Sequence, residues 1–168
     1  MKTPRLEAPG VVLRPLARAD APALFLAMSD AEAQRYRRQS PHQTVMETAS
    51  YIDDTLARGF GWAITVDGEE ALGRIALRVD GATGQIGIIL RGSAQGRGLG
   101  AASLRLVQAF AFEALRLEKL TADIDSENMK SLRLFARAGF TQTGFMRAGA
   151  ITHAGVRDSV IVAKAAAQ

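Results

Sequence analysis

The chain has 168 residues, of which 48% are hydrophobic and 23% charged, so it is long enough to bury the core of one domain. It has no cysteine, which excludes disulfides and a thiolate nucleophile, and its two histidines lie too far apart in sequence to suggest a metal site. The formal net charge of +4 suits an anionic ligand, but no long basic run indicates direct binding of nucleic acid.

The N-terminus and the longest apolar runs bear on the compartment. No apolar run reaches the roughly 18 residues that a membrane-spanning helix needs. The opening MKTPRLEAPG lacks the apolar middle region of a signal peptide. We therefore expect a cytoplasmic protein without a membrane partner, folded as one domain over residues 1–168 with its core at about 11–163.

The first third of the chain predicts one strand and two helices. Residues 11–16 read as a strand, and Asp20 can cap a helix that begins near Ala21. Residues 32–39 are polar and basic and receive no assignment. Thr44 and Glu47 have the spacing of a capping box, which predicts a second helix to about residue 58.

The middle of the chain is rich in β-branched residues. Three short strands are predicted at residues 62–66, 72–79 and 85–90. Because both connections are short and turn-like, the strands should form an antiparallel meander, since parallel strands need a longer crossover.

The last third returns to a mixed pattern. The predicted elements are a helix over 98–116, a strand over 120–124, a helix over 128–138 that ends at Gly139, and strands over 144–147 and 159–163. The order β-α-α-β-β-β-α-β-α-β-β predicts an α/β domain with a mixed, mostly antiparallel sheet flanked by helices.

A glycine-rich segment, Gln95-Gly96-Arg97-Gly98-Leu99-Gly100, lies between a predicted strand and a predicted helix. A helix N-terminus presents unpaired amides and partial positive charge, and glycines let a phosphate approach the backbone. Arg97 adds a cation, so the segment indicates a pyrophosphate site. The alternative is an ordinary glycine-rich turn. It is not a Walker loop, because no Gly-Lys-Ser/Thr follows.

The same segment also fits a dinucleotide fingerprint. Gly96, Gly98 and Ala101 match G-x-G-x-x-A, and Asp123 and Asp125 lie where a ribose-binding acid would follow. The antiparallel meander before the segment, and the short chain after Asp125, argue against this alternative.

A second motif lies in the run from Asn128 to Phe140. With Gln95, Gly98 and Gly100 opening one helix, and Asn128, Ser131, Gly139 and Phe140 in the next, the chain resembles the GNAT superfamily of N-acetyltransferases. The resemblance covers about residues 11–163, and it implies a V-shaped splay between the strands that end near Leu90 and Ile124.

Within that superfamily, the chain is most similar to the subgroup that acetylates the N-termini of ribosomal proteins. Residues 12–16, 86–90 and 155–158 carry this closer likeness. Many relatives in the subgroup act on other amines.

The resemblance implies roles for individual residues. Ile88, Ile89 and Leu90 would lie beside the pantetheine of acetyl-CoA, which would pair with them like an added strand. Residues 95–100 would hold the pyrophosphate. Asn128 would contact the pantetheine arm or orient the thioester, although it can also be only a helix N-cap. Phe135 would contact the cofactor, although such a position is more often core.

The implied reaction transfers an acetyl group from acetyl-CoA to a primary amine, a protein N-terminus or a small molecule, by direct attack on the thioester. Two departures weaken the catalytic assignment, because many relatives have Glu where this chain has Gln85 and Tyr where it has Phe135. Ser131 is a candidate proton donor or a packing residue, and Asp123, Asp125, Glu47 and His153 are candidate bases.

Two alternatives to an active enzyme stay open, a catalytically weak CoA-binding module and a dinucleotide-binding protein. Neither a metal nor a further cofactor is expected. The sequence leaves the acceptor amine, the acyl length and the oligomeric state open, a homodimer included.

Overall fold

A computed structural model describes residues 2–167, which form one eight-stranded sheet with the strand order β1-β2-β3-β4-β5-β6-β8-β7. The strands are β1 (Leu6–Ala8), β2 (Val11–Pro15), β3 (Gly59–Thr65), β4 (Gly73–Asp80), β5 (Thr83–Leu90), β6 (Lys119–Asp125), β7 (Thr141–Thr152) and β8 (Gly155–Ala165). The α-helices are α1 (Ala21–Met28), α2 (Val45–Ala57), α3 (Leu99–Ala109) and α4 (Met129–Arg137). The predicted mixed, mostly antiparallel sheet is confirmed, since β5 and β6 alone pair in parallel among these strands.

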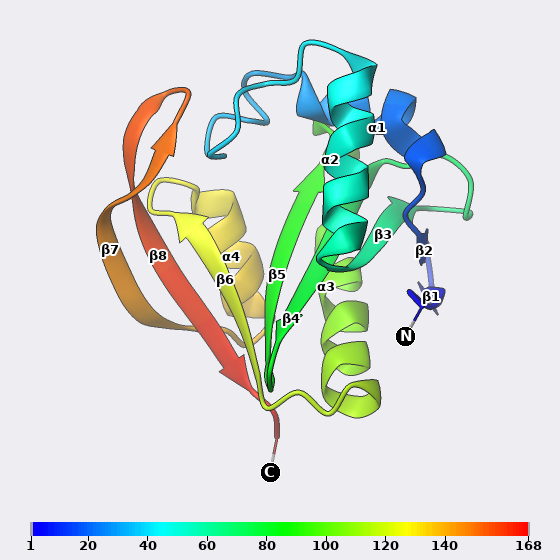
Figure 1. Ribbon diagram of the computed structural model, residues 1–168. Coiled ribbons are helices and arrows are strands. Elements are labelled where there is room, and N and C mark those ends of the chain that lie inside the picture. Colours follow the sequence, from blue (N-terminus) through cyan, green and yellow to red (C-terminus); the bar gives the residue numbers. More distant parts are fainter. Residues whose placement is uncertain (1, 168) are drawn as a thin grey trace.

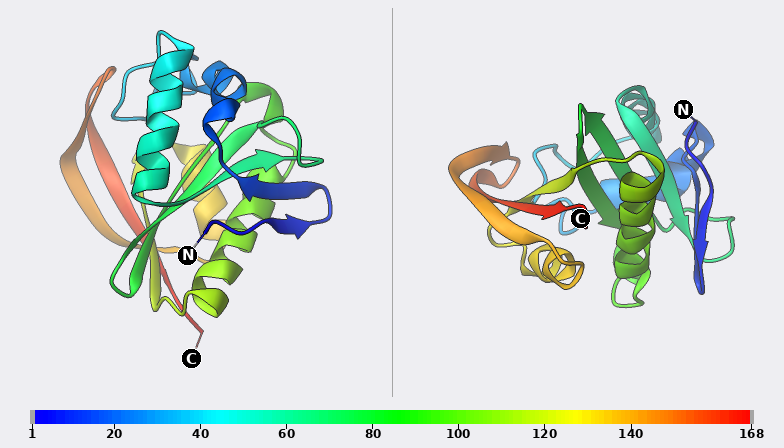
Figure 2. Two further views of the ribbon diagram at one scale, coloured as in Figure 1. Left: turned by 45° about the vertical axis from the view of Figure 1, so that its right-hand side comes forward. Right: turned by 90° about the horizontal axis from the view of Figure 1, so that it is seen from below.

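Helices cover both faces of this sheet. Figures 1 and 2 show α1 and α2 on one face and α3 and α4 on the other. Successive side chains of β3 point to opposite faces of the sheet, as strand geometry requires, and so pack against different helices. Trp62 and Ile64 belong to the core that includes α3, whereas Ala63 packs in the cluster with Leu24 of α1 and Ile52 of α2.

The parallel pairing of β5 with β6 is short. The register joins only Thr83 to Lys119, Gly84 to Leu120 and Gln85 to Thr121. Past these pairs β6 continues beside β8, while β5 continues beside β4, and the two strands diverge (Figure 1). The predicted V-shaped splay is therefore confirmed. The dinucleotide-binding alternative, which the sequence already disfavoured, does not fit this mostly antiparallel sheet, because a doubly wound sheet is mostly parallel.

The helix caps were predicted with mixed success. Thr44 is the N-cap of α2, since its hydroxyl accepts a 3.2 Å hydrogen bond from the Glu47 amide. The Asp20 cap is wrong. Its carboxylate makes no cap hydrogen bond to α1 but binds the guanidinium of Arg14 and accepts from the amide of Ala17 at 2.9 Å. A buried carboxylate gains more from charge-assisted hydrogen bonds to a half-buried guanidinium than from the amides of a helix end, which explains why Asp20 binds Arg14 instead.

Several element lengths differ from the prediction. Strand β1 was missed, and β7 and β8 are much longer than the segments 144–147 and 159–163. The predicted helix 98–116 ends as α3 at Ala109, and a π-helical turn over Phe110–Ala114 follows it. None of the helices in the described part of the chain is long and apolar enough to cross a membrane.

Candidate active site

The divergence of β5 and β6 opens a cleft between them. A cavity of about 150 Å³ lies there. It is lined by residues of β5, β6, α4 and the connection before α2: Ala33, Tyr36, Arg37, Ile86, Gly87, Ile88, Ile89, Ala122, Asp123, Ile124, Asp125, Asn128, Ser131 and Phe135. The strands can spread because their pairing ends at Gln85, so the fold itself makes this cleft.

Five of the twelve predicted site residues meet at this cleft. Ile88 and Ile89 line it from β5, and Asn128, Ser131 and Phe135 line it from α4 and its N-terminus. Phe135 serves two purposes, because it is 1% exposed and also packs edge-on against Phe140 at 5.0 Å between ring centroids. Phe135 is therefore a core residue that also lines the cleft, and its contact with the cofactor stays a prediction.

Leu90 lies beyond the cavity, against the start of α3. A Cβ built on Gly100 would lie 3.4 Å from Leu90, 3.5 Å from Leu134 and 3.8 Å from Ile88. The N-terminal turn of α3 thus packs directly on the end of β5. This contact places the glycine-rich segment at one end of the cleft.

The glycine-rich segment has the backbone that a phosphate site needs. Gly96 and Gly98 both have positive φ, 75° and 77°, a conformation that residues with a Cβ rarely adopt. Gly98 is the N-cap of α3 and offers no side chain to its first amides. Those amides therefore stay available to an anion. The side chain of Leu99 is buried in the core, so only its backbone can contribute.

Two polar side chains tie this segment to its surroundings. Gln95 donates from Nε2 to the Leu90 carbonyl at 3.3 Å, and its Oε1 accepts from Lys130 of α4 at 3.5 Å. Arg97 is exposed beside them. Lys130 was not predicted as a site residue, although its place two positions after Asn128 could have suggested it. The segment therefore has two nearby cations.

Asn128 caps α4, as predicted. Its Oδ1 accepts a 3.1 Å hydrogen bond from the Ser131 amide. The cap holds the start of α4 at the cleft, with the side chains of Asn128 and Ser131 both on its wall.

The two aspartates of the cleft are engaged by arginines. Asp125 receives two hydrogen bonds from Arg157 of β8, at 2.8 and 3.1 Å, and Asp123 receives one from Arg38 at 3.0 Å. Hydrogen bonds to Asp125 and Glu127 raise the pKa of Arg157 above its usual value. These ion pairs bind the end of β6 to β8 and to the connection before α2.

The other candidate bases lie elsewhere. Glu47 accepts from the Gln43 amide at 2.7 Å, and His153 is exposed in the turn between β7 and β8. Gln85 is exposed where β5 and β6 part, outside the cavity lining. The structure therefore brings Asp123 and Asp125 into the cleft and leaves Gln85 and His153 outside it.

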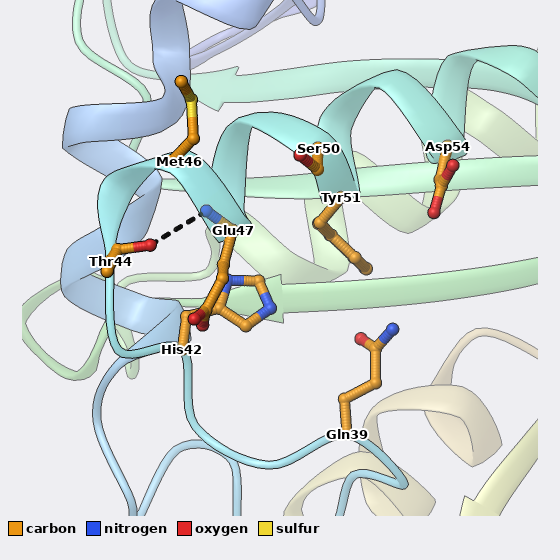
Figure 3. A pocket seen from close by; sticks show the side chains of 8 residues that line it. All are labelled: Gln39, His42, Thr44, Met46, Glu47, Ser50, Tyr51 and Asp54. Carbon is orange, nitrogen blue, oxygen red and sulfur yellow. Dashed lines mark hydrogen bonds between the residues drawn. The ribbon is translucent and has the colours of Figure 1, made fainter.

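A second cavity, of about 410 Å³, lies along α2. Figure 3 shows its lining: Gln39, His42, Thr44, Met46, Glu47, Ser50, Tyr51 and Asp54. His42 is buried, and its Nδ1 lies 2.9 Å from the hydroxyl of Thr48. Burial lowers the pKa of His42, an effect partly opposed by Glu47. Tyr51 packs edge-on against His42 at 5.7 Å.

Arginines connect this second cavity to the cleft. Arg37, which lines the cleft, donates to the Tyr51 hydroxyl at 2.9 Å, and Arg74 of β4 donates to the same hydroxyl. Sequence reasoning missed all three residues. One signal was available, because a charged residue within the apolar strand 72–79 is unusual.

Comparison with known proteins agrees with this architecture. Residues 11–141 match the family model described as Acetyltransferase (GNAT) domain. Spermidine N(1)-acetyltransferase of Escherichia coli K12 is 28% identical over 140 residues, which cover 80% of this chain and 74% of that protein.

Solved structures match over nearly the whole chain. A putative acetyltransferase from T. thermophilus superposes with a TM-score of 0.85 at 28% identity, covering 98% of this chain and 91% of the other. RimJ of Mycobacterium smegmatis, in complex with CoA-disulfide, has a TM-score of 0.85 at 24% identity and coverages of 97% and 86%.

Proposed function

The chain belongs to the GNAT family of acetyltransferases and is an acetyl-CoA-dependent N-acetyltransferase, and on that premise we propose that it acetylates a primary amine by direct attack on the thioester. The observation that carries the proposal is the meeting of β5, Asn128 and Ser131 at one cleft whose end is the glycine-rich turn of α3. We propose further that residues 1–168 act as one catalytic domain in the cytoplasm.

The pyrophosphate of acetyl-CoA would bind residues 95–100. The free amides of α3, the absence of any heavy atom within 4 Å of a Cβ built on Gly96 or Gly98, and the cations of Arg97 and Lys130 support this assignment. The pantetheine would then run along Ile88–Leu90, where β5 has left β6. Asn128 would donate from Nδ2 to a carbonyl of the arm.

The chemistry joins the amine nitrogen to the acetyl carbon and breaks the carbon–sulfur bond, so the thiolate leaves with the bonding electrons. A backbone amide of β5 would stabilise the oxyanion that forms between these events. The ammonium proton would pass to a base or to water, and a proton would reach the sulfur from Ser131 or from solvent. Asp123 and Asp125 are weak candidates for the base, because arginines hold both carboxylates.

The test is thiol release from acetyl-CoA in the presence of spermidine, peptides with free N-termini and amino acids. Amine-dependent release, with the acetylated amine identified by mass, is the expected result. Tight binding of acetyl-CoA without release by any of these amines would favour a catalytically weak CoA-binding module, as Gln85 and Phe135 would allow.

A further inference from the structure

Two arginines from different elements converge on one tyrosine hydroxyl. Arg37 of the connection before α2 and Arg74 of β4 both donate to the hydroxyl of Tyr51 on α2. Their guanidinium carbons lie 5.8 and 5.1 Å from the centroid of the Tyr51 ring. Two cations are thus held side by side against one aromatic ring.

Neither cation has an acidic partner. Among residues 2–167, no ion pair includes Arg37 or Arg74, and the Nε atoms of both are buried without a hydrogen-bond acceptor. Burial lowers the pKa of Arg37 to about 10. Burial and then the charge of Arg37 lower the pKa of Arg74. Desolvated like charges without a counterion are costly, and a bound anion would offset that cost.

The pair borders the cleft at a point where the strand has no side chain. Arg74 donates from Nη1 to the Gly87 carbonyl at 3.0 Å, and Gly87 lines the cleft. A Cβ on Gly87 would lie 3.5 Å from Arg74 Nη1 and 4.0 Å from Nη2. With glycine at this position, no side chain of residue 87 lies against the guanidinium. Arg74 itself is only 6% exposed.

Arg74 lies on the face of β5 opposite the glycine-rich turn of α3. Ile88 and Leu90 lie near Gly100 of α3 on one face of the sheet, whereas Gly87 lies near Arg74, which donates to Tyr51 of α2 on the other face. The acceptor can therefore approach from the α2 face while the thioester lies along β5. Tyr51 also lines the larger cavity, which gives this face room for a ligand.

The surrounding carboxylates do not neutralise the two arginines. Asp123 and Asp125 are bound by Arg38 and Arg157. Glu47 accepts from the Gln43 amide, and Asp54 is exposed on α2. A second ammonium group of a polycationic acceptor would be repelled by the positive charges of Arg37 and Arg74.

We infer that the acceptor is a primary amine that also carries a carboxylate, and that Arg37 and Arg74 bind this carboxylate while the amine faces Ile88. The inference rests on the proposed acetyl transfer, because it names the acceptor of that reaction. Guanidinium groups suit the role, since they bind carboxylates through paired, charge-assisted hydrogen bonds.

The test compares acids with their neutral amides. The twenty standard amino acids and β-alanine are each paired with the corresponding amide, and spermidine is added as a polycation. Thiol release measures kcat/KM, and calorimetry on the CoA-loaded protein measures acceptor binding. For the best acid, we expect both quantities to favour the acid over its amide by about tenfold or more, the effect of losing hydrogen bonds to a charged group.

Variants assign the preference to the two arginines. Arg37→Met and Arg74→Met, which keep the length of the side chain, should each remove most of the acid-over-amide ratio. Arg35→Met is the matched control, because Arg35 is exposed and lies outside both cavities. Arg37→Gln gives a second test should the buried Arg74→Met protein fail to fold, and acetyl-CoA affinity reports folding in every variant.

The carboxylate site and acetyl transfer can fail independently, and the results distinguish the two. Equal use of acids, amides and spermidine, or an equal loss for all of them in the variants, would overturn the carboxylate site while acetyl transfer stands. Acid-selective binding without thiol release for any amine would overturn acetyl transfer while the carboxylate site stands.

Discussion

Asn128 Oδ1 accepts a hydrogen bond from the backbone amide of Ser131 at 3.1 Å, so the carbonyl end of this side chain is committed to capping α4. Its Nδ2 makes no hydrogen bond to another atom of the chain within residues 2–167, and Asn128 lines the cleft. One side chain thus holds the helix in place and still offers a donor to a ligand.

Replacing Asn128 separates these two tasks. Asn128→Asp keeps an acceptor for the cap, so its melting temperature should stay within about 2 °C, but the lost donor should weaken acetyl-CoA binding about tenfold. Asn128→Ala should also lose the cap, with a fall of about 2–6 °C. Calorimetry measures the acetyl-CoA affinity, and thermal melting measures the melting temperature. Unchanged acetyl-CoA affinity in both variants would limit Asn128 to the helix.

Gly98 should matter for its backbone conformation. A Cβ at this position would meet no heavy atom within 4 Å, but φ is 77°. A β-branched residue is strained there by about 1–2 kcal/mol, and relief of the strain would turn the first amides of α3. We expect Gly98→Val to weaken acetyl-CoA binding about tenfold or more.

Gly98→Asn is the control for that variant, because asparagine tolerates a positive φ. It should bind acetyl-CoA within about threefold of the natural protein, a difference well under 1 kcal/mol. Equal affinities for all three proteins, measured by calorimetry, would remove residues 95–100 from the phosphate site.

Replacing Ser131 tests whether its hydroxyl supplies the proton to the leaving sulfur. Its hydroxyl makes no hydrogen bond within the chain segment that the structure describes, so Ser131→Ala should change stability by less than about 0.5 kcal/mol. We expect turnover, measured by thiol release, to stay within about threefold. A general acid would instead contribute about 10²-fold or more.

Phe135→Tyr in the Ser131→Ala background checks the same point from a position one turn later on the same face of α4. Phe135 lines the cleft and could present a hydroxyl there. A large loss in Ser131→Ala that Phe135→Tyr restores would establish an acid at this place and contradict the expected neutral result.

His42 should make stability depend on pH. Its pKa is lowered by burial, so the unfolded chain, with a pKa near 6.5, binds the proton more readily than the folded protein. Its contribution is therefore complete above about pH 6.5 and is lost as the pH falls toward the lowered folded value. Between pH 7.5 and pH 5.5, the natural protein should lose more thermal stability than His42→Asn, whose amide can still bond Thr48. Identical slopes would count against this assignment.

The sequence predicted best what depends on local pattern. Alternation and short turns predicted β3, β4 and β5, and the Asn128 motif predicted the cap of α4 correctly. These features need only neighbouring residues. The divergence of β5 and β6 came from the family resemblance, and the register confirms it.

Contacts between distant residues could not be predicted in this way. The Tyr51 hydroxyl joins Arg37 and Arg74, which lie 14 and 23 residues away in the chain, and nothing in the sequence indicates that the three residues meet. The predicted role of the Asp20 carboxylate was wrong although its partner is near in the sequence, because Arg14, six residues before it, binds that carboxylate and outcompetes the helix amides. Which partner such a side chain binds is seen only in the packed structure.

The two outer strands of the sheet also affect how the protein behaves in concentrated solution. Strand β1 has three residues, and β7, at the other edge, shifts register at Gln142/Gly144 and again at Met146/Ala150. A chain that tried to add to either edge would find too short a strand at one and an interrupted row of amides at the other. Neither edge therefore offers a long, regular strand for pairing with another chain. The protein should resist edge-to-edge aggregation even though Phe145 and Ile151 are exposed on β7.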